Sequence, residues 1–247
     1  MDWREQDGLR WLDATLPGAR VAFSTRLGGV SEAPFETLNL GILTGDARSA
    51  VLENRTRLAA AVGLQPERVL MGLQVHGSEV QAHGSAQDPS PYAHPGSPLP
   101  EVDGHVTASP GLAPLVLVAD CLPVALAGPG GVAMLHCGWR GLAAGIVAHG
   151  AEMVGAEAAA IGPGIGRCCY EVGDEVLERF AALGDGIADG RMLDLTEVVR
   201  RQLRAAGVQR IESAGLCTSC EPELFFSHRR DGEHSGRQGG LVWLDDQ

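Results

Sequence analysis

The feature that most constrains the fold is a pair of short apolar runs separated by a glycine-rich turn. Residues 124–127 and 132–136 flank Gly128-Pro129-Gly130-Gly131, which is the pattern of a β-hairpin. A regular winding of parallel strands joins each strand to the next through a helix, so it would not contain this hairpin. Because helical segments occur on the same chain, we predict an α+β fold, a sandwich with mixed β-sheets.

The remaining elements are predicted from apolar spacing and from residues that start or end helices. Strand-length apolar runs lie at residues 21–24, 69–73, 115–118, 158–161 and 241–244. Helical spacing lies at residues 46–62 with Asp46 as the cap, at 141–154, at 172–183, and from Asp194 to Gly207. No repeat or clear linker divides the 247 residues, so we expect a single domain over residues 1–247.

Composition excludes several classes of protein. The chain has a net charge of −12, and its basic residues are all Arg, without basic clusters, so we expect no nucleic-acid partner. No apolar run approaches the roughly 20 residues of a membrane span. Residues 1–12 are charged and do not resemble a signal peptide. We therefore expect a cytoplasmic protein without a membrane partner, with its six Cys as thiols or metal ligands. The sequence carries no prediction of oligomeric state.

Three side chains at predicted strand ends could carry chemistry. His76 lies in Gln74-Val75-His76-Gly77, Cys121 follows the apolar run that ends at Ala119, and His136 closes the second hairpin strand. Two His and one Cys suit Zn or Cu, and three ligands leave one position open for water or substrate. Spacing alone leaves two alternatives open: structural His residues with a buried thiol, or a Cys121 thiolate nucleophile with a His base.

The other cysteines give weaker signals. Cys217 and Cys220 form a C-x-x-C pair, which could bind Zn or act as a redox dithiol. A metal site would need a second ligand pair, and the adjacent Cys168 and Cys169 are too tightly spaced to chelate conventionally. We therefore expect ordinary thiols at these positions. Cys137 is expected to face away from His136, because neighbours on a strand point to opposite sides.

Arginines near glycines mark candidate anion sites. Arg140 lies in Gly138-Trp139-Arg140-Gly141, before a predicted helix, and Arg26 precedes Gly28-Gly29 after a predicted strand. The segment 226–238 adds Arg229, Arg230 and Arg237, within what reads as a polar loop. We interpret residues 162–166 as a tight turn and Trp139 as a core residue. Residues 85–100 contain five Pro, and we interpret them as a loop on the surface.

Taken together, several segments resemble one family. They are STRLGGVS (24–31), LNLG (38–41), GD (45–46), ENR (53–55), QVHG (74–77), VDG (102–104), VT (106–107), ADCLPV (119–124), LHCGWRG (135–141), GPGIGRCCYEVGDEV (162–176) and FFSHRRDG…GRQ (225–238). The chain resembles the laccase-domain, or YfiH-type, proteins over residues of about 20–245. These proteins were long labelled polyphenol oxidases and later assigned as purine nucleoside phosphorylases.

The resemblance implies a layered α/β/β/α sandwich and one Zn held by His76, Cys121 and His136, with Cu as the other candidate metal. It implies phosphorolysis of adenosine, inosine, guanosine and 5′-methylthioadenosine, together with deamination of adenosine. Arg26, Arg140 or Arg237 would then hold the phosphate. The older oxidase label is disfavoured, because a multicopper oxidase needs four coppers, typically held by His-X-His pairs, and no two His here are separated by one residue. A Cys121-dependent hydrolase and a non-enzymatic binding protein remain the alternatives.

Overall fold

Two mixed β-sheets face one another, and helices cover the outer face of each. The computed structural model describes residues 1–245. The first sheet contains, in spatial order, β1 (Asp2–Gln6), β2 (Leu9–Leu16), β3 (Ala19–Ser24), β14 (Gln238–Leu244), β7 (Ala113–Val118) and β4 (Val69–Leu70). The second contains β13 (Arg210–Ser213), β10 (Ala158–Ile161), β8 (Leu122–Gly128), β9 (Gly131–Cys137), β6 (Gly104–Thr107) and β5 (Val80–His83). A separate short pair joins β11 (Ala188–Asp189) to β12 (Met192–Leu193).

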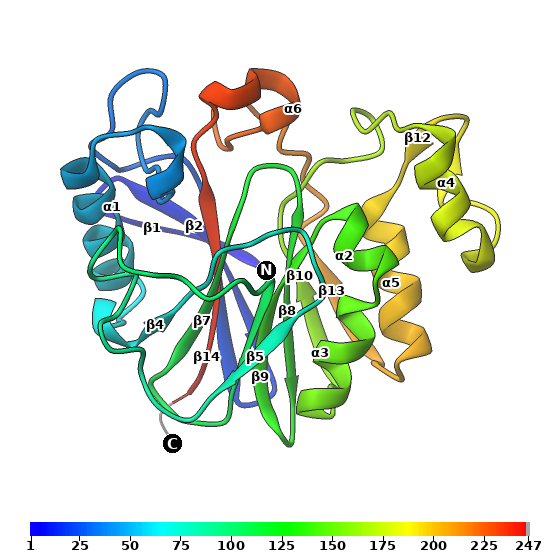
Figure 1. Cartoon of the computed structure of the whole chain (residues 1–247), viewed down its shortest axis with the longest axis horizontal. Helices are drawn as coiled ribbons and strands as arrows, with labels where there is room; N and C mark the ends of the chain where they lie inside the picture. The colour runs from blue at the N-terminus through cyan, green and yellow to red at the C-terminus, as the bar shows by residue number, and fades with distance from the viewer. Residues whose placement is uncertain (246–247) are drawn as a thin grey trace.

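The helices form the two outer layers. They are α1 (Arg48–Ala61), α2 (Trp139–Ala143), α3 (Ile146–Val154), α4 (Asp174–Phe180), α5 (Leu195–Ala205) and α6 (His228–Asp231), with short 3-10 turns at Ile42–Thr44, Pro66–Arg68, Ala181–Leu183 and Gly232–His234. Figure 1 shows α1 on one side of the sheets and α2, α3 and α5 on the other. Parallel pairs (β4–β7, β5–β6, β10–β13) occur among antiparallel ones, so both sheets are mixed. The predicted α/β/β/α sandwich with mixed sheets is confirmed.

Apolar side chains fill each of the three interfaces between layers. Leu58 of α1 packs with Leu115 of β7 beneath the first sheet. Phe23 and Met134 lie in the cluster between the two sheets. The second sheet buries residues such as Leu135 against α3 and α5. Cys137 belongs to this outer cluster, so it faces away from the inter-sheet side, as strand alternation predicts.

The predicted hairpin is β8–β9, with Gly128 paired to Gly131. The predicted helix 141–154 is wrong as one element, because Gly145 adopts φ 89° and separates α2 from α3. Asp46 does not cap α1, which begins after Ala47. Its carboxylate instead accepts hydrogen bonds from Ser31 Oγ and Asn39 Nδ2. The predicted start of the fourth helix is confirmed: Asp194 accepts from the Glu197 N–H at 2.9 Å.

The proline-rich loop 85–100 is packed against the rest of the molecule. Tyr92 is fully buried and donates its hydroxyl to the Arg55 carbonyl at 2.7 Å. The Arg55 guanidinium in return donates to the carbonyls of Pro91 and Tyr92. Leu99, near the end of the loop, lines a cavity of about 570 Å³. The loop is therefore part of a cavity wall, which the interpretation as a loop on the surface did not anticipate.

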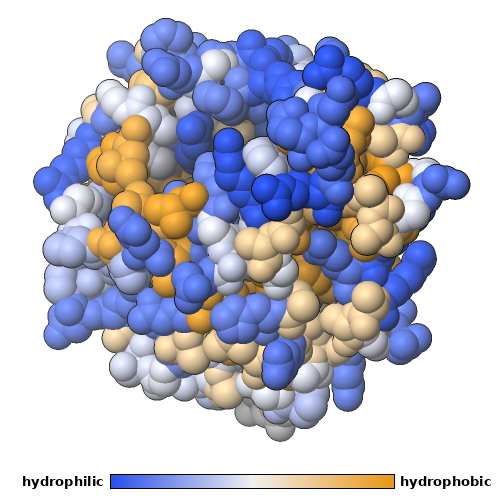
Figure 2. All heavy atoms as spheres, turned by 45° about the vertical axis from the view of Figure 1, so that its right-hand side comes forward, coloured by the Kyte–Doolittle hydropathy of each residue, from blue (hydrophilic) through white to orange (hydrophobic). Residues whose placement is uncertain are grey.

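The face of the molecule in Figure 2 carries many hydrophilic side chains, with apolar ones gathered in patches among them. The large apolar side chains that are exposed are Trp3, Val30, Leu43, Leu52 and Val75. Within residues 1–245, no helix combines the length and apolar character that crossing a membrane requires.

Two connections that pass from the first sheet to the second position the candidate site. The chain leaves β4 and enters β5 through a segment that contains His76. It leaves β7 and enters β8 through a short turn that contains Cys121. Pro123 pairs with His136, so the start of β8 and the end of β9 lie side by side. Residues that are 15 to 60 positions apart in sequence therefore meet at one end of the sandwich.

Candidate metal and substrate site

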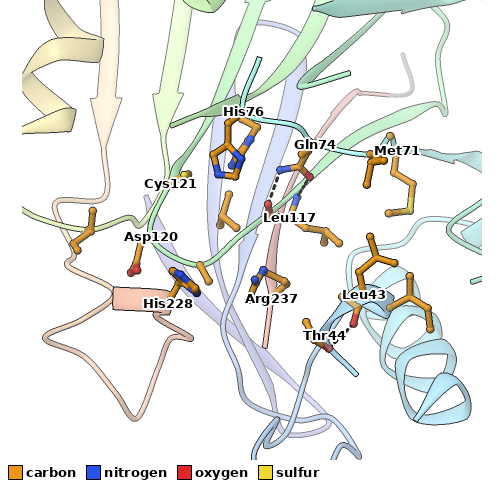
Figure 3. A pocket seen from close by; sticks show the side chains of 18 of the residues that line it. Leu43, Thr44, Met71, Gln74, His76, Leu117, Asp120, Cys121, His228 and Arg237 are labelled. Atoms are coloured by element: carbon orange, nitrogen blue, oxygen red, sulfur yellow. Dashed lines mark hydrogen bonds between the residues drawn. The ribbon is translucent and has the colours of Figure 1, made fainter. Parts of the chain in front are cut away.

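A cavity of about 570 Å³ opens at this end of the sandwich. Its lining includes His76, Cys121, His136, Trp139, Arg140, Tyr170, His228, Arg229 and Arg237, together with Leu43, Thr44, Met71 and Leu99. Figure 3 shows His76 and Cys121 at one end of the cavity and Leu43, Thr44 and Met71 at the other. The volume falls within the range of small-molecule sites, which is roughly 300–1,000 Å³.

His76, Cys121 and His136 meet at the cavity wall, and we call them the His-Cys-His cluster. One ligand atom from each side chain lies within 4.8 Å of the other two. The two imidazoles are 4.8 Å apart between ring centroids and are tilted edge to face by 67°. His136 is buried and Cys121 half-buried, whereas His76 is exposed toward the cavity. The structure therefore brings together the three residues that the strand ends singled out.

Backbone conformation at these turns is unusual. His76 has φ 61° and Asp120, directly before Cys121, has φ 100°, a region that non-glycine residues rarely adopt. Gln74 holds the first turn, because its side-chain amide donates to the Leu117 carbonyl and accepts from the Leu117 N–H (Figure 3). Such strained positions persist where the surroundings fix them, and they concentrate at functional sites.

Asp103 orients both histidines from beneath the cluster. Its side chain is fully buried, and its Oδ1 atom lies 2.7 Å from His136 Nδ1. Since a carboxylate only accepts, His136 Nδ1 donates to Asp103, and Nε2 is the ring nitrogen that would bind a metal once its own proton is released. The same carboxylate accepts the backbone N–H groups of Val75, His76 and Gly77. Its pKa lies below its ordinary value, because these hydrogen bonds and His136 outweigh burial.

The surroundings of Cys121 lower the pKa of its thiol. Burial alone would raise the pKa of this thiol, but the charge on His136 and hydrogen bonds from His136 and His76 lower it to about 6. Burial likewise opposes protonation of His136, but the Cys121 thiolate and the Asp103 carboxylate raise its pKa to about 9. A thiolate is the form of Cys that binds metals, and also the form that acts as a nucleophile.

The donor set fits a single borderline metal ion. Two imidazoles and one thiolate are ligands of Zn, and three protein ligands are the pattern of a catalytic site with an open position. Gly138 leaves the required space: a Cβ there would lie 2.9 Å from Cys121 Sγ and 3.1 Å from His76 Cδ2. The hydrogen bond from His136 to Asp103 matches the outer contact that usually orients a metal-binding His.

Two of the three predicted phosphate-binding arginines line the cavity. Arg140 is exposed on α2, with its guanidinium carbon 4.5 Å from the centre of the Trp139 ring. Trp139 is half-buried: it packs against the apolar cluster outside the second sheet, as a core residue would, and it also lines the cavity. Arg237 is held by hydrogen bonds from Nη1 to the carbonyls of Ser235 and Gly236. Burial lowers its pKa, while Asp120 and Cys121 act in the opposite direction.

Arg26 does not join this group. Its Nε atom donates to the Glu36 carbonyl at 2.6 Å, and Nη1 donates to the Pro222 carbonyl at 3.1 Å. The guanidinium also stacks over the Phe226 ring at 4.7 Å. These contacts fasten neighbouring loops together, and Arg26 is absent from the described residues that line the cavity. The expectation that Arg26 holds phosphate is therefore not carried forward.

Asp120 braces the turn that presents Cys121. Its Oδ1 atom accepts the Thr218 hydroxyl, and its Oδ2 atom accepts the Arg229 N–H, both at 2.6 Å. Both carboxylate oxygens are therefore occupied by fixed donors. With both oxygens engaged, Asp120 is placed to hold this turn rather than to donate a proton to a substrate.

Sequence reasoning missed several residues that shape the site. Asp103 stands out in the sequence only as part of the motif VDG; it lies directly before β6, which pairs with β9, the strand of His136. Tyr170 and His228 also line the cavity. Their segments, 162–176 and 225–238, lie far from the His-Cys-His cluster in sequence, so spacing could not place them.

The sequence of this chain matches a known family of proteins over most of its length. The model of the family described as "Multi-copper polyphenol oxidoreductase laccase" matches residues 20–245. The chain belongs to this laccase-like family, and the resemblance noted in the sequence is confirmed.

Individual relatives match along nearly the whole chain. Purine nucleoside phosphorylase YlmD of Geobacillus stearothermophilus is 36% identical, with 96% of each chain covered. Purine nucleoside phosphorylase YfiH of Escherichia coli is 37% identical, covering 92% of this chain and 94% of its own. The crystal structure of Bacillus licheniformis YfiH superposes with a TM-score of 0.88 at 31% identity, covering 98% of this chain and 99% of its own. That of YlmD from G. stearothermophilus gives 0.87 at 35% identity, with 98% of each chain covered.

Proposed function

We propose that this protein is a metal-dependent purine nucleoside phosphorylase that also deaminates adenosine. The observation that carries the proposal is the convergence of His76, Cys121 and His136 on the wall of a cavity that also holds Arg140 and Arg237. The names of the YlmD and YfiH relatives support the same activity class. The substrates proposed are adenosine, inosine, guanosine and 5′-methylthioadenosine, with inorganic phosphate as the second reactant.

The arginines suit the phosphate. Phosphorolysis forms a bond from a phosphate oxygen to C1′ of the ribose and breaks the bond from C1′ to the purine nitrogen, which keeps the electron pair. The transition state resembles an oxocarbenium ion, so the phosphate must be held in place beside the sugar. The guanidinium groups of Arg140 and Arg237 can donate paired hydrogen bonds to phosphate oxygens at the cavity wall.

Zn is the proposed metal, with Cu as the other candidate, held by His76, Cys121 and His136. When bound, Zn supplies a Lewis acid and a water of lowered pKa, which is the chemistry that deamination of a purine requires. Asp103 fixes the proton on Nδ1 of His136 and holds the turn of His76, so both imidazoles are oriented before any ligand arrives. Gly138 keeps the space beside Cys121 open.

The decisive experiment is chromatography of adenosine incubated with the purified protein, with and without phosphate. Adenine and ribose 1-phosphate that form only with phosphate support phosphorolysis, and inosine supports deamination. Absence of both products would overturn the proposal. The metal content of each protein is measured in the same experiment. We expect Cys121→Ala to lose one Zn per chain and all turnover. The control is Asp13→Asn, at a buried carboxylate bound to Arg20, which is expected to keep its Zn and its activity.

The main alternative is a hydrolase with Cys121 as nucleophile. The low pKa of this thiol and the neighbouring imidazoles favour it as the second candidate. It predicts activity in protein stripped of metal, and loss of that activity when Cys121 is alkylated at neutral pH. The proposed phosphorylase predicts inactive stripped protein whose activity returns with Zn.

A further inference from the structure

Four cysteines outside the His-Cys-His cluster lie together on the surface beside the cavity. Cys168 and Cys169 follow the turn after β10, and Cys217 and Cys220 follow β13. All four sulfurs lie within 4.8 Å of one another, and all four thiols are free. The Cys220 sulfur is 3.4 Å from that of Cys168 and 3.4 Å from that of Cys169. We call these residues the four-cysteine cluster.

The spacing of these sulfurs matches a tetrahedral thiolate site. Four sulfurs around Zn at about 2.3 Å are separated from each other by about 3.8 Å. Two of the separations in the cluster are 3.4 Å, and none exceeds 4.8 Å. C-x-x-C is the common chelating spacing for Zn, and adjacent Cys168 and Cys169 supply the second pair that the sequence did not predict.

Backbone groups around the cluster favour charged sulfur. The Gly166 N–H donates to Cys217 Sγ at 3.2 Å. N–H groups directed at sulfur are the outer contacts that thiolate metal sites use. A side chain at Gly166 would crowd the cluster, since its Cβ would lie 3.1 Å from the Cys217 Cβ and 3.2 Å from the Cys168 sulfur.

We propose that Cys168, Cys169, Cys217 and Cys220 bind one structural Zn ion, separate from the metal of the His-Cys-His cluster. Four thiolates complete the coordination shell of Zn, so this site leaves no position for substrate. Each Cys contributes its thiol proton to solvent and its sulfur lone pair to the metal, without any change of oxidation state.

The ion would fasten together two loops, the first of which contributes Ile165 and Tyr170 to the cavity lining. Gly164 and Cys217 already form an isolated β-bridge between these loops. Thr218 binds the carboxylate of Asp120, and Arg229 donates to the carbonyls of Cys169 and Glu171. A metal at the four-cysteine cluster thus holds the segments that brace the turn of Cys121.

The test measures metal content in a chain from which the first site has been removed. Cys121→Ala protein, purified as expressed without chelator, is analysed for Zn, Cu and Fe, and one Zn per chain is expected to remain. Adding Cys217→Ser and Cys220→Ser is expected to remove this Zn, whereas adding Ser219→Ala in the same loop leaves it in place. A Cys121→Ala chain without Zn, or with iron in its place, overturns the proposal, whatever the outcome for nucleosides.

A second measurement keeps the test decisive if the serine variants fail to fold. The Cys121→Ala protein is treated with iodoacetamide before and after a chelator, and the labelled sites are located by mass spectrometry. Cys168 and Cys220 are exposed, yet we expect them to resist labelling until the metal is removed. Labelling without the chelator overturns the proposal. So does an intact mass lighter by two hydrogens, which would indicate a disulfide.

Discussion

Asp103 joins the two histidines of the His-Cys-His cluster: one oxygen of its carboxylate lies 2.7 Å from His136 Nδ1 and also accepts the His76 N–H at 3.0 Å. A buried anion of this kind orients metal ligands without touching the metal. We therefore predict that Asp103→Asn weakens Zn binding at the cluster by about 10- to 100-fold. Competition with a coloured chelator measures this change.

The control for this variant is Asp13→Asn. Asp13 is also a buried carboxylate, but its partner is Arg20 on the neighbouring strand, far from the cavity lining. Its substitution is expected to leave Zn affinity unchanged. Circular dichroism confirms that both variants are folded, and equal affinities in folded Asp103→Asn and wild-type protein would contradict the role given to Asp103.

Arg140 is expected to act on phosphate rather than on the nucleoside. A hydrogen bond to a charged group contributes roughly 1.5–3 kcal/mol, so Arg140→Gln should raise the KM for phosphate by about 10-fold or more. The KM for adenosine should change much less. Steady-state kinetics with each reactant varied in turn separate the two effects.

Arg26→Gln provides the matched comparison for Arg140. The Arg26 guanidinium donates to the carbonyls of Glu36 and Pro222, so its loss should lower thermal stability and leave the KM for phosphate near the wild-type value. An equal rise of both KM values in Arg140→Gln would count against phosphate binding by this residue.

Tyr92 anchors the proline-rich loop against α1. Its buried hydroxyl donates a second hydrogen bond to the Arg55 carbonyl, which already accepts the helical N–H four residues on in α1, so Tyr92→Phe removes this extra bond without leaving the carbonyl unpartnered. We expect the free energy of unfolding to fall by about 1 kcal/mol. Urea denaturation measures it, with Ser97→Ala as the control, since that hydroxyl is bound to a carbonyl at an exposed position. A Tyr92→Phe protein as stable as wild type would show that this bond contributes nothing net.

His105 predicts an acid-sensitive contribution to stability. This imidazole is buried in β6, with Nδ1 3.0 Å from His83 Nε2. Burial, followed by the repulsion of His83, lowers its pKa from 6.5 to about 3. The unfolded state therefore binds a proton that the native state does not bind between these pH values. Stability from neutral His105 is complete above pH 6.5 and is lost as the pH falls toward about 3.

Urea denaturation at a series of pH values tests this sign. His105→Gln does not titrate, so the decline of its unfolding free energy below pH 6.5 should be shallower than that of wild type. His94→Gln, at an exposed His, should keep the wild-type slope. Parallel curves for wild type and His105→Gln would contradict the assignment.

The buried strands of the two sheets could be predicted from the sequence, but the exposed edge strand β1 could not. Short apolar strands and the β8–β9 hairpin carry their own signals, because buried strands consist of residues that pack on both faces. The hairpin β1–β2 was missed, since every residue of β1 is exposed and its charges obscure the alternation. Its turn at Asp7-Gly8, with φ 51° and 80°, was nevertheless a recognisable hairpin signal.

The candidate site was predictable in part for a similar reason. His76, Cys121 and His136 each lie where an apolar run ends, so local sequence marks them individually. Their partners are long-range: Asp103 reaches His136 across a strand pair, and Thr218 reaches Asp120 over 98 residues. The four-cysteine cluster was missed because two pairs that are unremarkable alone become a site only when separate loops are brought together.

The two sheet-crossing connections have a consequence for how the molecule is assembled. His76 and Cys121 each lie on a segment that begins in the first sheet and ends in the second. His136 lies on a strand of the second sheet. Neither half of the sandwich, folded separately, could gather all three side chains. Metal binding by these three side chains during refolding would therefore occur only after the two sheets have packed together. The rate of metal binding would report how fast the sheets pack.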